Sequence, residues 1–144
     1  MSQSNLSRLI SPRSIAVVGH RGADFAIRGS LKLGYTGKIW AVHPSRETIE
    51  GLECYKSVRD LPEPPDATFI AVNAEAAIEI VTDLKQIGGG GAVLYASGFG
   101  EVGEDGVKRN QRLVAAAGKM PIIGPNCYGF INSLDSVALW PDLH

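Results

Sequence analysis

The chain has 144 residues, of which 44% are hydrophobic and 20% charged, the composition of one folded domain and not of a disordered chain. Its 14 Lys and Arg residues almost balance its 15 Asp and Glu residues, so the formal net charge of −1 disfavours a general nucleic-acid-binding surface. The wide separation of Cys54 and Cys127, and the spacing of His20, His43 and His144, disfavour a disulfide scaffold and a zinc site.

The sequence also lacks the signals of membrane insertion and export. No apolar stretch approaches the ~20 residues of a membrane-spanning helix. The polar N-terminus lacks the apolar core of a secretory signal. We therefore expect a soluble, cytoplasmic protein whose partners include neither a membrane nor nucleic acid.

Apolar runs and turn residues predict helices and strands that alternate along the chain. Helices are expected over residues 6–10, 25–33, 74–87 and 105–117, with a helical turn near 57–61. Strands are expected over residues 14–18, 38–42, 67–72, 92–96 and 121–124, with a short extended piece at 52–55. In the last helix, helical spacing predicts that Val107, Leu113, Val114 and Ala117 face inward. The glycine run at 88–91 is interpreted as a helix-to-strand connection and not as a linker.

This alternation predicts the fold class. Strands that alternate with helices indicate parallel strands joined by right-handed crossovers. Continuous apolar strands such as residues 14–18 are typical of strands that are buried on both faces. We predict an α/β fold, a Rossmann-like open parallel sheet with helices on both faces, over residues 1–132. Residues 133–144 show no periodic pattern and are interpreted as the start of a linker to a missing next domain.

The loops at the carboxyl ends of the strands are expected to form the ligand site, as in other open parallel sheets. After the first strand, Gly19-His20-Arg21-Gly22 leads into a helix whose N-terminus can bind a phosphate. Arg21 and Arg28 are expected to add positive charge there. The G-x-x-G spacing is not the G-x-G-x-x-G of dinucleotide-binding enzymes, so a simple tight turn is an equal alternative.

The loop after the second strand lacks the Asp or Glu with which NAD enzymes bind the ribose. It offers Arg46, whose guanidinium suits a phosphate, so a phosphorylated ribose, as in NADP or coenzyme A (CoA), fits better than a bare one. The alternative is that Arg46 is a solvated surface residue.

The remaining loops give weaker signals. Asn73 is expected to cap the helix that follows it. Residues 96–101, which are rich in glycine and follow the fourth strand, are expected either to pass close under a ligand or to form a plain turn with Phe99 in the core. Cys127, in the last loop, is a candidate nucleophile but is better interpreted as a buried packing residue, because the sequence shows no Cys-His pair.

Several of these segments form a series in a fixed order. They are SIAVVG at 14–19, GYTG at 34–37, VHP at 42–44, GLECY at 51–55, DLPE at 60–63, SGFGEVG at 97–103 and IGPNCYGFIN at 123–132. The series resembles the CoA-binding domain of the NDP-forming acyl-CoA synthetases, whose wider relatives include the α subunit of succinyl-CoA synthetase. The resemblance covers nearly the whole chain and is most specific at Gly-Pro-Asn-Cys, residues 124–127.

The resemblance implies a role in binding CoA for each matching position. Gly19, His20, Arg21 and Gly22 would hold the phosphates, Ser45 and Arg46 the adenosine end, Val72 and Asn73 the nucleotide, Ser97 and Gly98 the pantetheine arm, and Asn126 and Cys127 would shape the wall beneath the thiol. The sequence departs from the family pattern where His20-Arg21 replaces Ala-Ser, His43 replaces Asn and Asn73 replaces Pro.

The resemblance also implies the reaction of a longer parent enzyme. Such enzymes join a carboxylic acid to CoA while a nucleoside triphosphate is made or split, through an acyl phosphate and a phosphohistidine. A phosphohistidine ligase domain and an ATP-grasp domain would be the partners of this chain, which is interpreted as a fragment that binds CoA and catalyses nothing alone.

Three alternatives stay open at this point. They are a stand-alone CoA-binding regulatory protein, an NAD(P)-dependent oxidoreductase domain, and a parent that carries a fused protein acetyltransferase domain. One substitution tests the first loop: Gly22→Asp is expected to abolish CoA binding and leave the fold intact.

Overall fold

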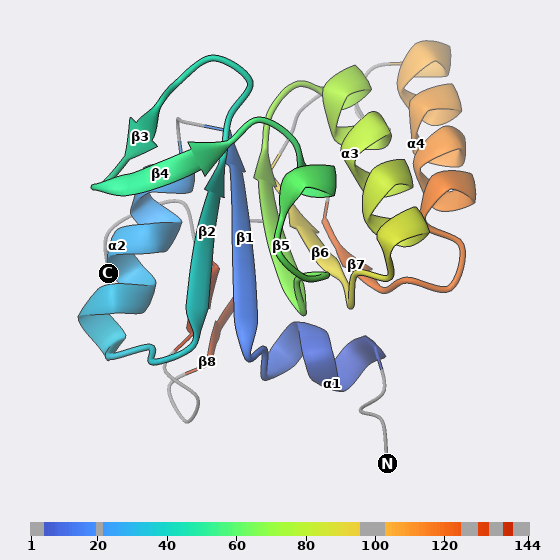
Figure 1. Ribbon diagram of the computed structural model, residues 1–144. Helices are drawn as coiled ribbons and strands as arrows, with labels where there is room; N and C mark the ends of the chain where they lie inside the picture. The colour runs from blue at the N-terminus through green and yellow to red at the C-terminus, as the bar shows by residue number, and fades with distance from the viewer. Residues whose placement is uncertain (1–4, 20–21, 96–102, 125–129, 133–136, 140–144) are drawn as a thin grey trace.

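The computed structural model describes residues 5–19, 22–95, 103–124, 130–132 and 137–139. Its centre is a sheet of seven strands in the order β3-β4-β2-β1-β5-β6-β7, in which every neighbouring pair is parallel except β3 and β4 (Figure 1). The strands are β1 (Ser14–Gly19), β2 (Lys38–Val42), β3 (Thr48–Ile49), β4 (Leu52–Tyr55), β5 (Ala67–Ala71), β6 (Ala92–Leu94) and β7 (Ile122–Ile123). The helices are α1 (Asn5–Ile10), α2 (Ala23–Leu33), η1 (Val58–Asp60, a 3-10 helix), α3 (Ala74–Ile87) and α4 (Gly103–Ala117).

The sheet is buried on both faces, which confirms the predicted Rossmann-like α/β fold. All six residues of β1 are buried, and β1 is the centre of the sheet between β2 and β5. Ile15 and Val17 of β1 pack into one core with α2, whereas Val18 belongs to the core that α3 and α4 cover. Side chains alternate between the two faces because successive residues of a strand point to opposite sides of the sheet.

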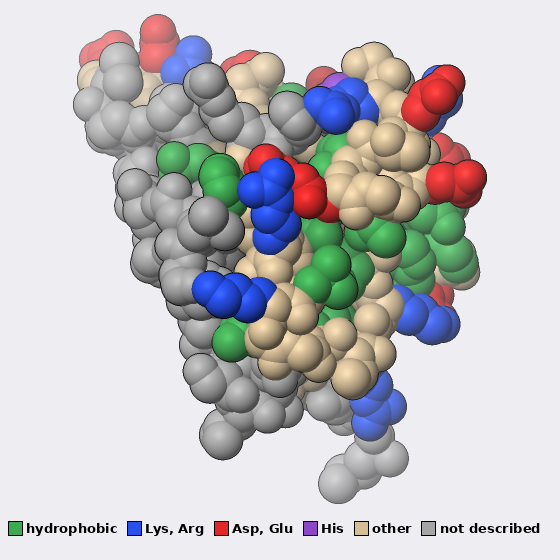
Figure 2. Space-filling model, turned by 90° about the vertical axis from the view of Figure 1, so that its left-hand side faces the viewer, with side chains coloured by type: hydrophobic (Ala, Val, Ile, Leu, Met, Phe, Trp, Pro, Cys, Tyr) green, Lys and Arg blue, Asp and Glu red, His purple; other side chains and the backbone are tan. Residues whose placement is uncertain are grey.

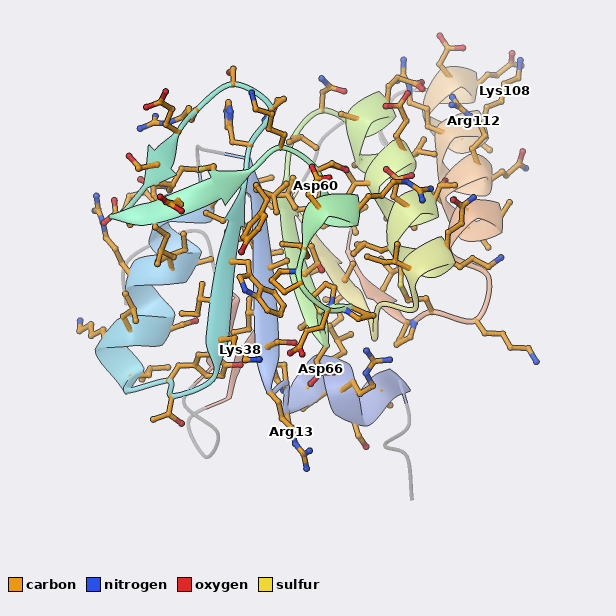
Figure 3. The ribbon with its side chains drawn as sticks, in the orientation of Figure 1. Arg13, Lys38, Asp60, Asp66, Lys108 and Arg112 are labelled. Carbon is orange, nitrogen blue, oxygen red and sulfur yellow. The ribbon has the colours of Figure 1, made fainter. Side chains whose placement is uncertain are left out.

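The glycine run at 88–91 connects α3 to β6, as predicted, and packing leaves no room for a side chain at Gly90. A Cβ atom at Gly90 would lie 2.3 Å from the Asp66 carbonyl oxygen and 2.7 Å from Cβ of Arg8 on α1. Asp66 also accepts hydrogen bonds from Arg8 Nε and from the backbone N–H of Arg13, each at 2.8 Å. Figure 3 labels Asp66 and Arg13 at this lower end of the sheet, where α1 is therefore held against β5.

One prediction for α4 is wrong. Leu113 and Ala117 face inward, but Val107 is 49% and Val114 is 63% exposed. The helix packs mainly on α3 at the β7 end of the sheet (Figure 1), and the Val107 and Val114 half of its predicted apolar stripe meets solvent. Arg112 of α4 donates two hydrogen bonds of 2.9 Å to Glu75 of α3, and this pairing holds the pKa of Glu75 below its usual value.

Three short strands have no counterpart in the sequence analysis. Strand β3 forms a hairpin with β4 at the sheet edge, and β8 (Phe130–Asn132) pairs antiparallel with β9 (Val137–Leu139). Strand β9 lies against α2, so a segment beyond Asn132 returns to the first half of the chain. The division of the chain at residue 132 stays a prediction.

The surface of the described part carries mixed charge. On the face turned toward the viewer in Figure 2, Lys and Arg side chains are dispersed among Asp and Glu and form no stripe. The longest of the described helices is α4, with 15 residues, and none of them has the length and apolar character that crossing a bilayer requires.

Candidate functional site

The candidate site lies where the strand order reverses, at the carboxyl ends of β1, β2 and β5. From β1 the chain moves outward to β2 and β4, and then returns to the other side of β1 as β5. Gly19 pairs with Ala71 of β5, and Val18 pairs with Val42 of β2, so Gly19 leaves the sheet beside His43. Ligands of open α/β sheets bind at such a switch point, which is the upper edge of the sheet in Figure 1.

The turn after β1 requires a glycine at its start. Gly19 has φ +108°, and a Cβ atom there would lie 2.3 Å from the Ala71 carbonyl oxygen and 3.3 Å from Cγ1 of Val72. Any side chain would therefore collide with β5. At Gly19, a predicted phosphate-binding residue, the backbone of β1 thus passes close to the backbone of β5. The Val72 side chain lies beside it.

The same turn ends at Gly22, which is the N-cap of α2. Its φ is +89°, it is buried, and its carbonyl oxygen accepts the hydrogen bond of the Ala26 N–H at 3.1 Å. Because Gly22 has no side chain, it cannot cap the first N–H groups of α2. The positive end of the helix dipole is therefore suited to an anion. His20 and Arg21, the other two predicted residues of this turn, lie outside the described residues.

The turn after β2 is held by one imidazole. Nδ1 of His43 accepts hydrogen bonds from the backbone N–H of Ser45 at 3.1 Å and of Arg46 at 2.9 Å. The backbone N–H of His43 donates to Tyr55 at 2.9 Å, so the turn begins fixed to β4. Ser45 and Arg46, both predicted site residues, are exposed at its tip.

The Arg46 guanidinium lies over the hairpin of β3 and β4. Its Nε is 3.4 Å from the Thr48 carbonyl oxygen, and no carboxylate pairs with it in the described part of the chain. Burial raises the pKa of the Cys54 thiol, and the nearby Arg46 charge acts in the opposite direction. Arg46 is therefore a cation at the carboxyl edge that is available to an anionic ligand.

Asn73 has the helix-capping role predicted for it. Its Oδ1 accepts the backbone N–H of Ala76 at 2.9 Å, at the start of α3. With its side chain oxygen occupied in this way, Asn73 contributes to the edge mainly by fixing where α3 begins, next to Val72.

Two charged residues of α2, Arg28 and Asp24, have surroundings that were not predicted. Arg28, expected to add charge to the first turn, instead donates to Glu50 at 2.9 Å and lies 5.5 Å from the Phe25 ring centroid. Local spacing does not reveal this pairing, because Glu50 is on the β3–β4 hairpin, far from Arg28 along the chain. Asp24, which the sequence analysis did not single out, has a buried Oδ1 that accepts no hydrogen bond from a described residue.

The later predicted positions, Ser97, Gly98, Asn126 and Cys127, lie outside the described residues. Gly124, directly before the last of these loops, is described: a Cβ atom there would lie 2.5 Å from the Leu94 carbonyl oxygen of β6. Within the described ranges, no cluster of three or more His, Cys, Asp or Glu could hold a metal ion.

The chain is similar to known proteins over nearly its whole length. A family model described as the CoA binding domain matches residues 13–133. A trans-feruloyl-CoA synthase from an unidentified prokaryote is 36% identical over 96% of this chain, which spans 20% of that protein. An ADP-forming acetate–CoA ligase II of Archaeoglobus fulgidus is 38% identical over 90% of this chain, again 20% of the longer protein.

Solved structures agree with the sequence relatives. The apo form of a dinucleotide-forming acetyl-coenzyme A synthetase 1 from Ca. Korarchaeum cryptofilum superposes with a TM-score of 0.87 and 30% identity. That match covers 94% of this chain and 31% of the other. The chain thus spans about a fifth to a third of the length of the proteins that it matches.

Proposed function

The chain belongs to the family of CoA-binding domains, and on that premise we propose that CoA lies across the carboxyl ends of β1, β2 and β5. The observation that carries the proposal is the register of β1 against β2. It brings the Gly19 turn beside the turn that holds Arg46. A diphosphate at one turn and a 3′-phosphate at the other are separated by one ribose in CoA, which suits two adjacent strands.

Each predicted site residue has a role in this proposal. The Gly19–Gly22 turn and the N-terminus of α2 hold the diphosphate, with His20 and Arg21 in the same turn. Ser45 and Arg46 hold the 3′-phosphate, Arg46 by charge-assisted hydrogen bonds. Val72 and Asn73 border the nucleotide, Ser97 and Gly98 the pantetheine arm, and Asn126 and Cys127 the thiol end.

We further infer that the whole protein is an NDP-forming acid–CoA ligase. The names of the relatives support this, because they are an acyl-CoA synthase and an ADP-forming acetate–CoA ligase. The proposed partners of this domain are a phosphohistidine ligase domain and an ATP-grasp domain of the same enzyme. Phosphohistidine and acyl-phosphate chemistry belongs to those domains, and the role of this chain is to hold CoA with its thiol toward them.

Calorimetric titration with CoA, dephospho-CoA and NADPH tests the site. Arg46→Ala is expected to weaken CoA binding about tenfold, as loss of a charge-assisted contact does, and to leave dephospho-CoA binding unchanged. Arg13→Ala is the matched control, because it removes the same charge from the opposite end of the sheet (Figure 3). Equal affinity of the wild-type chain for CoA and dephospho-CoA would show that Arg46 does not bind the 3′-phosphate. Tighter binding of NADPH than of CoA would favour an oxidoreductase domain.

A further inference from the structure

The Arg46 turn depends on a side chain to which no binding role has been assigned. The backbone N–H groups of Ser45 and Arg46 both point at Nδ1 of His43, at 3.1 and 2.9 Å. The Ser45 hydroxyl is 3.4 Å from the same nitrogen. Consecutive N–H groups in a turn have no strand partner, so the ring supplies the acceptor that the backbone lacks.

The geometry fixes the protonation state of the ring. A nitrogen that accepts two N–H donors carries no proton, so the proton of the neutral imidazole is on Nε2. His43 therefore acts in this turn as a short side chain with one well-placed acceptor. An Asn side chain has an acceptor of similar reach, its Oδ1, and commonly accepts from the backbone two residues ahead.

The rest of the turn transmits this restraint to the guanidinium. The carbonyl oxygen of Glu47 accepts the Cys54 N–H at 2.8 Å, which fixes the far end of the turn to β4. Arg46 thus lies between two anchors, the His43 ring and β4, and its Nε reaches the Thr48 carbonyl oxygen. Without the ring, the backbone bonds of His43 and Glu47 to β4 remain, but the N–H groups of Ser45 and Arg46 between them lose their acceptor.

We propose that His43 is a positioning residue for recognition of the 3′-phosphate of CoA: it holds the Arg46 turn through Nδ1 and does not itself touch the ligand. This rests on the proposed function, in which Arg46 binds that phosphate. The ring adds specificity for the phosphorylated ribose, because it acts through Ser45 and Arg46, the two residues that bind that phosphate in the proposed function.

The structural half of the proposal is tested without ligand. Amide hydrogen exchange of Ser45 and Arg46 is expected to be at least tenfold faster in His43→Ala than in the wild-type chain, and close to wild type in His43→Asn. Exchange in β1 stays unchanged in both variants, which shows that the sheet is intact. Unchanged exchange of Ser45 and Arg46 in His43→Ala would overturn the proposal whatever the ligand.

The functional half is tested by a double-mutant cycle measured with CoA and dephospho-CoA. His43→Ala is expected to weaken CoA binding about five- to tenfold, the loss of one to two neutral hydrogen bonds. It leaves dephospho-CoA binding unchanged and has a smaller effect in an Arg46→Ala background, where only the Ser45 contact is left to lose, and His43→Asn restores most of the CoA affinity.

Two results separate this inference from the proposed function. If Arg46→Ala selectively weakens CoA but His43→Ala weakens CoA and dephospho-CoA equally, His43 contacts the ligand or supports the fold, and the inference is wrong. If Arg46→Ala has no selective effect, the phosphate assignment is wrong and the inference fails with it, even where the exchange data match.

Discussion

At the scale of single residues, the carbonyl oxygen of a neighbouring strand excludes every residue except glycine at the end of β1. Gly19 combines φ +108° with a virtual Cβ atom 2.3 Å from the Ala71 carbonyl oxygen. Gly34, at the C-cap of α2, has φ +88° but nothing within 4 Å of its virtual Cβ. Comparing substitutions at these two glycines therefore separates the cost of backbone strain from the cost of steric collision.

Gly19→Ala is therefore expected to destabilise the fold by about 2–4 kcal/mol, the sum of a left-handed backbone and an overpacked contact. Gly34→Ala is expected to cost only about 1 kcal/mol, because the left-handed backbone is its sole penalty. Urea denaturation of the two variants measures the difference. Equal losses would show that the strand end moves away from β5 without cost.

The conformation of Gly22 changes how the first turn should be tested. From the sequence we expect Gly22→Asp to abolish CoA binding with the fold intact, but φ +89° strains any side chain at this position. A loss of binding in that variant would combine backbone strain with charge repulsion. A substitution that alters charge alone is needed.

Asp24→Asn meets that need. Asp24 is in the first turn of α2, beside the proposed diphosphate, and removing its negative charge is expected to tighten CoA binding about two- to fivefold at low salt. Glu63→Gln, which alters the carboxylate paired with Lys38, is the control and is expected to leave affinity unchanged. Calorimetry at two salt concentrations measures both. Unchanged affinity of Asp24→Asn would place the diphosphate elsewhere.

Among the site residues, the roles that could be predicted from sequence are those that depend on residues close by along the chain. Asn73 precedes an amphipathic helix, and a cap needs only residues three positions apart, so its role was predictable. Arg28 pairs with a residue 22 positions away, and the His43 ring turns back on its own loop; neither is visible in local spacing. Side-chain partners that depend on tertiary structure were therefore missed.

At the scale of elements, Tyr35 ties the loop before β2 to the segment before β1. Its hydroxyl is buried and donates to the Pro12 carbonyl oxygen at 3.0 Å. Burial, and then the negative charge of Asp66, raise the pKa of Tyr35 above its usual value. The folded chain therefore keeps this proton at a pH where the unfolded chain releases it.

The raised pKa of Tyr35 makes the stability of the fold depend on pH in the alkaline range. Below about pH 10 both states hold the proton and the contribution is complete; above it the unfolded state binds fewer protons, so stability falls as pH rises. Tyr35→Phe is expected to lose about 1 kcal/mol at pH 8 and to show a shallower decline toward pH 11. Urea denaturation across this range measures it. Parallel curves for the two proteins would contradict the pKa shift.

Long, strongly patterned elements were predicted from sequence and short ones were not. Helix α3 has the predicted bounds, Ala74–Ile87, because its apolar stripe repeats over several turns. Strands β3 and β9 have two and three residues, too few for a period, and exist through pairing with β4 and β8. In α4, the apolar stripe predicted that Val107 and Val114 are buried, but at the edge of the sheet no described element covers them.

At the scale of the whole molecule, the strand order follows from rules that the sequence obeys. Alternating strands and helices with right-handed crossovers place the carboxyl ends of the parallel strands at one edge, and the reversal beside β1 makes that edge a ligand site. The family motifs lie in these same loops, so fold and proposed site were predicted together. The registers, which bring Gly19 beside His43, required the structure.

The most direct measurement is a crystal structure of this chain with CoA. We predict the diphosphate at the Gly19–Gly22 turn and the 3′-phosphate within hydrogen-bond distance of Arg46, whose turn keeps its bonds to the His43 ring. Density for CoA at the opposite end of the sheet, near Asp66, or a carboxylate side chain bound to the ribose in place of Arg46, would contradict it.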